Sequence, residues 1–241
     1  MRIAIIGCGA MGTILGAYIT KNGRVVEMID NNEAHISKMK ATGAEIIGHD
    51  NFKVPVKALL PHEMDGIYDV VFLFTKQTAN PIVLPHLLKF LDENSVVCTL
   101  QNGVPETSVA EVVGTARTVG GTTNWSATFK GPGVSELTQD LNKTPYLFEI
   151  GEIDGKITDR INTISEILGL MGRPTKISTK IMESRWSKVV LNACVSGMSA
   201  VCGMTFGEVL DNDKARACSI YIGHEVKLAC EAEGYKLQPF N

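Results

Sequence analysis

Short, almost continuously apolar runs alternate with longer amphipathic stretches along the first half of the chain. The apolar runs predict β-strands, at residues 2–6, 24–30, 52–59, 69–75 and 95–100. The amphipathic stretches predict helices, at residues 11–22, 33–42 and 82–91. Apolar strands separated by helices indicate a parallel sheet that is covered on both faces and built from β-α-β units. The strand at 52–59 contains a proline and is expected near an edge of the sheet.

The pattern changes twice further along the chain. Residues 114–151 are rich in threonine and glycine. Further strands are predicted at 118–128, 133–137, 145–151 and 175–179, with a helix at 157–170. From residue 180 to 235 the pattern is helical almost throughout, with interruptions near 203–207 and 211–214. We therefore expect an α/β protein, with a Rossmann-type dinucleotide-binding domain at 1–180 and an all-α substrate domain at 181–241.

Composition narrows the range of partners. The net charge is −3, and the scattered lysines and arginines provide no basic field that could hold a nucleic acid. The six cysteines form no C-x-x-C pair and the five histidines lack metal-ligand spacing, which indicates buried thiols and no metal site. We find no signal peptide or membrane span, because polar residues interrupt the apolar stretch 189–206, and expect a cytoplasmic protein.

The first predicted strand runs directly into the sequence GCGAMG at residues 7–12. This fits the pattern G-x-G-x-x-G, which becomes specific when it follows a strand and opens a helix, as it does here. Gly7 permits a tight turn, Gly9 allows a pyrophosphate to approach the backbone, and Gly12 allows the helix and strand to pack closely. The context favours a dinucleotide site over the alternative, a glycine-rich turn without a ligand.

Asp30 ends the second predicted strand of this unit. A carboxylate at that position accepts hydrogen bonds from a ribose 2′-OH and repels a 2′-phosphate, which favours NADH over NADPH. The alternative is that Arg24, Lys38 or Lys40 folds round to hold the phosphate.

Two later loops follow the carboxyl ends of apolar strands, where ligands bind in open α/β sheets. One loop contains Lys76, which could pair with a phosphate or carboxylate, and the other contains Asn102, which could offer an amide to the nicotinamide ribose or a substrate. A solvated lysine and an Asn-Gly turn are the alternatives. Their shared location on the predicted binding edge favours a functional role.

The helical part contains the segment RWSKVVLNACVSGMSA, residues 185–200, in which polar residues stand among apolar ones. Lys188, Asn192 and Ser196 recur every fourth residue and so form one stripe on a helix. Because an unpaired buried ammonium is costly, the stripe is expected to face a cleft or an anion, unless Lys188 snorkels on a partly exposed helix. Next to a bound dihydronicotinamide, a partly desolvated Lys188 is a candidate general acid for carbonyl reduction.

Five segments in order, GCGAMG, TKQ at 75–77, LQNGV at 100–104, GGTT at 120–123 and RWSKVVLNA at 185–193, resemble the ketopantoate reductase (2-dehydropantoate 2-reductase) family. The resemblance implies NADPH-dependent reduction of 2-dehydropantoate to (R)-pantoate, a step toward pantothenate and coenzyme A. It assigns the cofactor pyrophosphate to the glycine turn, Gly7, Cys8, Gly9, Ala10, Met11 and Gly12.

The same resemblance implies further site residues. Lys76, Asn102 and Ser126 contact the cofactor, and Asn102 also touches the substrate. Lys188 matches the family's general acid, and Asn192 matches a substrate ligand one turn further on.

Three departures from the family pattern bear on function. Ser196 stands where members often have a second asparagine, which bears on the substrate. Asp30, Asn31 and Asn32 stand where many have an arginine, which bears on the preference for NADPH. The family's helical domain usually continues for several helices that supply a substrate-binding serine and a glutamate near the active site. We therefore expect either a chain without its natural C-terminus or a short form with an incomplete cleft.

Three functions follow from these patterns. The first is reduction of a 2-oxo acid, with NADPH or NADH as cofactor and ketopantoate as the favoured substrate. The second is a β-hydroxyacid dehydrogenase, which also pairs a Rossmann domain with a helical one bearing lysine and asparagine four apart; the TKQ, LQNGV and RWSK segments argue against it. The third is dinucleotide binding without turnover. The expected partner is a small-molecule substrate, and we expect the protein to bind neither a nucleic acid nor a membrane. A homodimer is compatible with the sequence.

Overall fold

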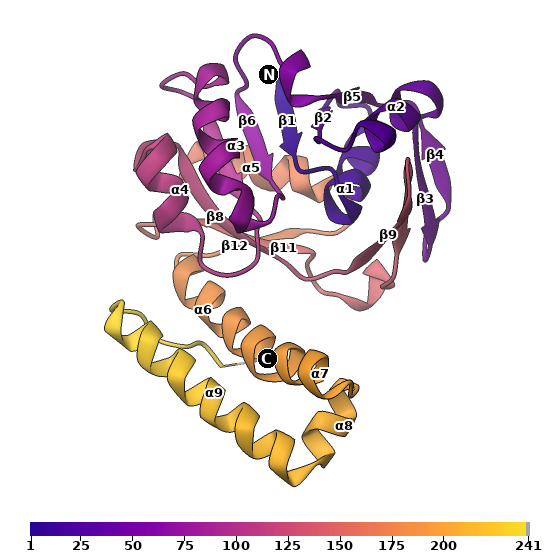
Figure 1. The fold of residues 1–241 in the computed structure, drawn as a ribbon. Helices are drawn as coiled ribbons and strands as arrows, with labels where there is room; N and C mark the ends of the chain where they lie inside the picture. Colours follow the sequence, from indigo (N-terminus) through magenta and orange to yellow (C-terminus); the bar gives the residue numbers. More distant parts are fainter. Residues whose placement is uncertain (240–241) are drawn as a thin grey trace. The chain divides into compact units, whose positions relative to one another are not determined.

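The computed structural model describes residues 1–239 and divides into two compact units (Figure 1). The larger unit comprises Met1–Gln101 and Pro105–Thr179, and the smaller comprises Asn102–Val104 and the chain from Lys180 onward. Strands and helices alternate in the larger unit, while the regular structure of the smaller unit between Lys180 and residue 239 consists of helices, the last of which ends at Ala232. The expected fold class, a Rossmann-type α/β part followed by an all-α part, is confirmed.

An eight-stranded sheet forms the centre of the larger unit, with the order β12-β11-β8-β7-β6-β1-β2-β5 (Figure 1). In chain order its strands are β1 (Ile3–Ile6), β2 (Glu27–Ile29), β5 (Lys57–Leu59), β6 (Val70–Leu73), β7 (Val96–Thr99), β8 (Thr118–Thr123), β11 (Phe148–Glu152) and β12 (Thr175–Ile177). From β5 to β8 each strand pairs in parallel with its neighbour, and β11 is antiparallel to β8. The chain steps from β1 out to β2 and β5 and then returns to β6 on the other side of β1. The strand order therefore reverses between β1 and β6, which is the topological switch point where ligands bind in such sheets.

Helices cover both faces of this sheet. They are α1 (Ala10–Lys21), α2 (Glu33–Thr42), α3 (Asn80–Leu87), α4 (Glu106–Val113) and α5 (Asp159–Gly169). Ile3 and Ile5 of β1 belong to one apolar cluster with α1 and α5, whereas Ala4 and Ile6 belong to a second cluster with α3 and α4. Because both faces are packed, the strands are apolar at successive positions instead of alternating.

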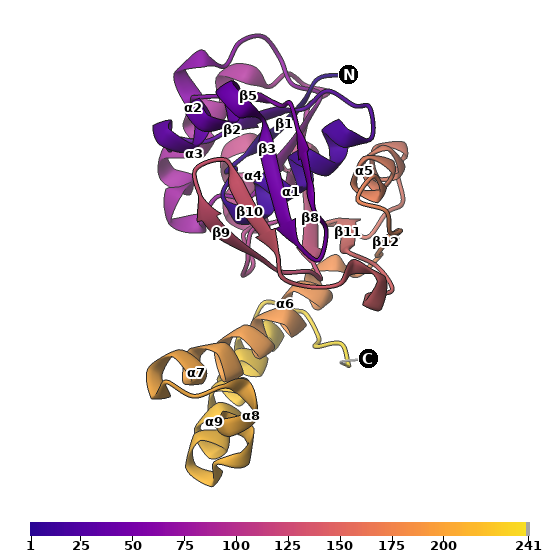
Figure 2. The ribbon, with the colours of Figure 1, turned by 90° about the vertical axis from the view of Figure 1, so that its right-hand side faces the viewer.

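A second, four-stranded sheet packs against α1 in the order β4-β3-β10-β9 (Figure 2). Its strands are β3 (Ala44–Gly48), β4 (Phe52–Val54), β9 (Ala127–Gly131) and β10 (Val134–Leu137). Helix α1 is therefore buried between two sheets, which explains why its residues are apolar or small almost all round.

Two segments that were each predicted as one strand are each divided into two strands in the structure. The segment 52–59 breaks at Pro55 into β4 and β5, which lie at the edges of different sheets because proline cannot donate a ladder hydrogen bond. The segment 118–128 likewise breaks at 124–126 into β8 and β9. Strand β3 and helix α4 were not predicted.

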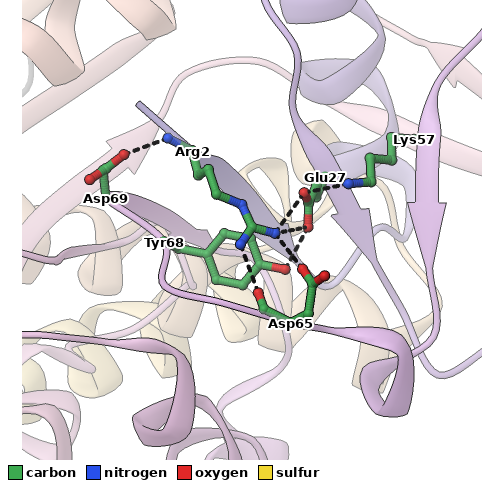
Figure 3. Close-up of polar contacts among 6 residues, drawn as sticks. All are labelled: Arg2, Glu27, Lys57, Asp65, Tyr68 and Asp69. Atoms are coloured by element: carbon green, nitrogen blue, oxygen red, sulfur yellow. Dashed lines mark hydrogen bonds and ion pairs between the residues drawn. The ribbon is translucent and has the colours of Figure 1, made fainter.

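A buried carboxylate joins four chain segments at the amino ends of the strands (Figure 3). Glu27, the first residue of β2, accepts hydrogen bonds from Arg2 at 2.9 Å, from Lys57 at 2.7 Å and from the hydroxyl of Tyr68 at 2.6 Å. Arg2 also donates to Asp65 at 2.7 Å. Burial alone would raise the pKa of Glu27, but these three donors outweigh it and lower the pKa. The cluster lies at the opposite end of β2 from Asp30 and thus fastens strands rather than serving the predicted ligand edge.

The helical unit consists of α6 (Ile181–Leu191), a π-turn (Asn192–Ser196), α7 (Gly197–Cys202), α8 (Phe206–Asp211) and α9 (Asp213–Ala232). The predicted interruptions near 203–207 and 211–214 correspond to the ends of α7 and α8. Asn212 caps α9 by accepting from the N–H groups of Lys214 and Ala215. Helix α9 packs along α6 and the π-turn (Figures 1 and 2). Among residues 1–239, no helix is both long enough and apolar enough to cross a lipid bilayer.

Candidate active site

The carboxyl ends of five parallel strands meet at one edge of the large sheet. In the spatial order β2, β1, β6, β7, β8, they are followed by Asp30, the glycine turn, Lys76, Gln101 and Ser126. With neighbouring strands about 4.8 Å apart, this row extends over roughly 19 Å. The edge therefore offers an extended ligand a line of backbone and polar groups, centred on the switch point.

The glycine turn has no room for side chains at two of its three glycines. A Cβ on Gly7, whose φ is +95°, would lie 2.6 Å from the backbone nitrogen of Thr75, and one on Gly12 would lie 2.4 Å from the Gly7 carbonyl oxygen. A Cβ on Gly9, in contrast, would meet no heavy atom of the described residues within 4 Å apart from those of its neighbours along the chain. Packing thus requires Gly7 and Gly12, whereas Gly9 opens onto free space, as a backbone that receives a ligand should.

Helix α1 begins directly at this turn. Gly9 precedes its first residue, Ala10, and has no side chain that could cap the first N–H groups. The first turn, which includes Met11, contains no acidic residue, so the positive end of the helix dipole is uncompensated there. Burial raises the pKa of the Cys8 thiol, which keeps it neutral, so this side chain brings no negative charge to the turn.

Asp30 follows β2 immediately, and its Oδ1 accepts a hydrogen bond from the N–H of Asn32 at 2.9 Å. Of the cations that the sequence offers for a 2′-phosphate, Lys40 is paired with Glu63 at 2.6 Å. Arg24 lies before β2, at the strand's opposite end. Lys38, the third of these cations, is exposed on α2, and the residues that directly follow β2 are one acid and two amides, Asp30, Asn31 and Asn32.

A buried glutamine joins the loops after β6 and β7. The Nε2 of Gln101 donates to the carbonyl of Thr75 at 2.8 Å and to Oδ1 of Asn80 at 2.7 Å. It thereby fixes the chain on both sides of the exposed Lys76. Sequence reasoning treated Gln101 only as a member of a polar loop; nothing in the local pattern indicates that its amide binds Thr75.

Ser126 lies in the loop that connects β8 to β9 and is exposed. Its hydroxyl is 2.8 Å from the hydroxyl of Thr138, and its carbonyl accepts from the N–H of Thr138. The local fold therefore fixes the serine at the β8 end of the row.

The remaining candidates, Asn102, Lys188, Asn192 and Ser196, belong to the helical unit. Lys188 lies on the last turn of α6 and is partly exposed as a residue. Burial of its amine and, to a smaller extent, repulsion from the nearby guanidinium of Arg185 together lower its pKa to about 8. A lysine with such a pKa is a stronger acid than an ordinary lysine and is typical of a functional site.

The helix widens where the polar stripe continues. Asn192–Ser196 form a π-turn, in which the N–H of Gly197 bonds to the carbonyl of Asn192. Four residues make slightly more than one turn of an α-helix but slightly less than one turn of a π-helix. Ser196 therefore lies on nearly the same side of the helix axis as Asn192. The sequence predicted a regular α-helix here.

Helix α9 supports this π-turn. The hydroxyl of the buried Ser219 donates to the carbonyl of Cys194 at 3.0 Å. A Cβ on Gly223 would lie 3.1 Å from the Cys194 sulfur, so α9 approaches the turn closely at that point. Sequence reasoning missed both residues, because their contacts come from a distant part of the chain.

The structure thus distributes the predicted residues over two sets. The glycine turn, Asp30, Lys76 and Ser126 lie along the sheet edge of the larger unit, and the other four belong to the helical unit. Residues 1–239 contain no group of three or more histidine, cysteine or acidic side chains that could hold a metal ion. The individual roles stay predictions.

Comparison with protein families gives two matches in chain order. The family model described as "Ketopantoate reductase PanE/ApbA" matches residues 3–152, and "Ketopantoate reductase PanE/ApbA C terminal" matches residues 180–240. The 2-dehydropantoate 2-reductase of Streptococcus pyogenes serotype M6 is 25% identical over 238 residues, which cover 98% of this chain and 76% of the relative. The enzyme of the same name from Pyrococcus horikoshii is 27% identical over 233 residues, 96% of this chain and 73% of the relative.

Solved structures agree with these matches. The 2-dehydropantoate 2-reductase from Geobacter metallireducens GS-15 has a TM-score of 0.83 at 26% identity, over 97% of this chain and 76% of the other. A ternary structure of D-mandelate dehydrogenase with NADH and anilino(oxo)acetate has a TM-score of 0.88 at 22% identity, over 99% and 76%, and so shares the fold. The resemblance predicted from five short segments is confirmed. The chain belongs to the ketopantoate reductase family and is an oxidoreductase of that family's type.

Proposed function

We propose that this chain reduces a 2-oxo acid at the expense of a reduced nicotinamide dinucleotide, with 2-dehydropantoate as substrate and (R)-pantoate, a precursor of pantothenate and coenzyme A, as product. Lys188 carries the proposal. A Rossmann unit alone is compatible with many reactions, but a partly buried lysine whose pKa is lowered to about 8, on a helix that continues into Asn192, favours carbonyl reduction.

The residues present fit the dinucleotide. The open space in front of Gly9 and the uncapped start of α1 would receive the pyrophosphate, and Asp30 would accept from a ribose hydroxyl. Lys76 and Ser126 would contact the cofactor further along the row. When bound, the reduced nicotinamide supplies the hydride that converts the 2-oxo group to an alcohol.

Lys188 would supply the proton that the carbonyl oxygen requires. With a pKa near 8 it is mostly protonated at neutral pH, yet it releases the proton more readily than a lysine of ordinary pKa. The amide of Asn192 and the hydroxyl of Ser196 are neutral donors suited to the carboxylate and hydroxyl oxygens of an oxyacid. The amide of Asn102 would serve the cofactor or the substrate.

Asp30 supports a preference for NADH. Its carboxylate would repel a 2′-phosphate, and Lys40, which could neutralise that phosphate, is paired with Glu63. The D-mandelate dehydrogenase of similar fold was solved with NADH, in keeping with this inference.

The direct test is oxidation of NADH or NADPH in the presence of ketopantoate. The reaction is monitored by the loss of dihydronicotinamide absorbance. We expect ketopantoate-dependent oxidation with a kcat/KM about tenfold or more higher for NADH, equivalent to about 1.4 kcal/mol. Phenylglyoxylate, the 2-oxo acid corresponding to mandelate, and 3-hydroxyisobutyrate with NAD⁺ serve as competing substrates. Turnover of 3-hydroxyisobutyrate alone would assign the chain to β-hydroxyacid chemistry, and dinucleotide binding without turnover would leave a binding protein.

A further inference from the structure

A chain of buried hydrogen bonds runs behind the glycine turn and begins at a histidine of α2. His35 is 1% exposed, and its Nδ1 accepts a hydrogen bond from the N–H of Gly133 at 2.8 Å. Because a backbone N–H can only donate, Nδ1 carries no proton, and the proton of the neutral ring is assigned to Nε2. Burial lowers the pKa of His35 and so favours this neutral form.

The ring connects to the turn through the hydroxyl of Thr13, and it also interacts with the backbone of Cys8 directly. Nε2 of His35 is 3.1 Å from Oγ1 of Thr13, which is fully buried on α1. The same Oγ1 donates to the carbonyl oxygen of Cys8 at 2.7 Å. The direction of every bond is therefore determined, from the N–H of Gly133 through His35 and Thr13 to the carbonyl of Cys8.

The last acceptor in this series of hydrogen bonds, the carbonyl of Cys8, belongs to the glycine turn itself. The carbonyl of Cys8 and the N–H of Gly9 belong to the same planar peptide, so a bond that orients one also orients the other. Gly9 is the glycine of the turn that opens onto free space.

We infer that His35 and Thr13 are positioning residues that hold the Cys8–Gly9 peptide in the orientation needed for a dinucleotide pyrophosphate, an inference that rests on the function proposed above. These hydrogen bonds connect the glycine turn to the β9–β10 connection through Gly133 and to the start of α2, close to Asp30. The small sheet, which forms no part of the predicted cofactor row, thereby contributes to dinucleotide affinity.

Variants that cut this chain at different points separate positioning from stability. Thr13→Val removes the hydroxyl and keeps the side-chain shape, whereas Thr13→Ser keeps the hydroxyl. His35→Asn retains an acceptor for Gly133 but does not reach Thr13. We expect Thr13→Val and His35→Asn each to raise the Kd for NADH about five- to tenfold, and Thr13→Ser to restore most of the affinity.

The measurement is the Kd for NADH by isothermal titration, with the thermal midpoint of each variant recorded beside it. Lower midpoints with an unchanged Kd would overturn the inference and make the chain of bonds a stabilising feature only. If His35→Asn does not fold, the Thr13→Val and Thr13→Ser pair decides alone. A wild-type protein that binds no dinucleotide would refute the proposed function itself, a result distinct from an unchanged Kd in the variants.

Discussion

Replacing Lys188 by alanine is expected to lower kcat for the reduction of the 2-oxo acid by about 10²–10⁴-fold, the usual contribution of a positioned general acid. The Kd for NADH should stay close to the wild-type value, because the glycine turn and the start of α1 belong to the other unit. Steady-state turnover with ketopantoate measures the first quantity, and isothermal titration with NADH measures the second.

Lys227→Ala is the matched control for this prediction. Lys227 belongs to the same helical unit but is exposed on α9, where it pairs with Glu231 at 3.5 Å. Its removal should leave both kcat and Kd unchanged, since an exposed i,i+4 pair contributes only about 0.3–0.5 kcal/mol to stability. A Lys188→Ala variant that keeps its kcat within a factor of about three would eliminate the lysine as the proton donor.

Replacing Gly9 by alanine should weaken NADH binding by more than it destabilises the fold. The added methyl meets only open space in the protein and φ is −65°, but ψ of −150° lies beyond the usual extended range, so the free energy of unfolding should fall by about 1–3 kcal/mol at most. The methyl would, however, occupy the space through which the pyrophosphate approaches the backbone. Loss of a charge-assisted hydrogen bond of about 1.5–3 kcal/mol corresponds to a roughly 10- to 150-fold higher Kd.

Alanine substitutions at two further glycines serve as controls for this prediction. Gly169→Ala, at the end of α5, also places its methyl in open space, and should alter neither Kd nor folding beyond the usual gain from alanine in a helix. Gly12→Ala forces a methyl to 2.4 Å from the Gly7 carbonyl, and should lower the thermal midpoint together with the affinity. A Gly9→Ala variant that binds NADH as tightly as the wild type would place the pyrophosphate elsewhere.

Local signals predicted much of the fold. Helix α2 occupies the predicted residues 33–42, because Asn32 caps its start and Gly43, with φ +81°, ends it. The central strands were predicted because burial on both faces makes their residues apolar at successive positions. The glycine turn was predicted because its glycines meet a steric requirement that few other backbones impose.

The remaining structure depends on contacts that no local pattern encodes. Strand β3 was missed, and β9 was separated from β8 only in the structure, because sheet membership is decided by distant partners. The π-turn at Asn192–Ser196 has the same cause, since the hydroxyl that satisfies its Cys194 carbonyl comes from α9. Candidate side chains could therefore be chosen by residue type, whereas partners such as Gln101 and Thr13 could not.

The pH dependence of kcat/KM for the 2-oxo acid tests most directly whether Lys188 is the acid. Since the protonated amine is the active form and its pKa is lowered to about 8, kcat/KM should be highest below that pH and fall about tenfold per pH unit above it. The residual activity of Lys188→Ala should lack this decline. A wild-type profile that stays level to about pH 10, where an ordinary lysine still holds its proton, would contradict the account.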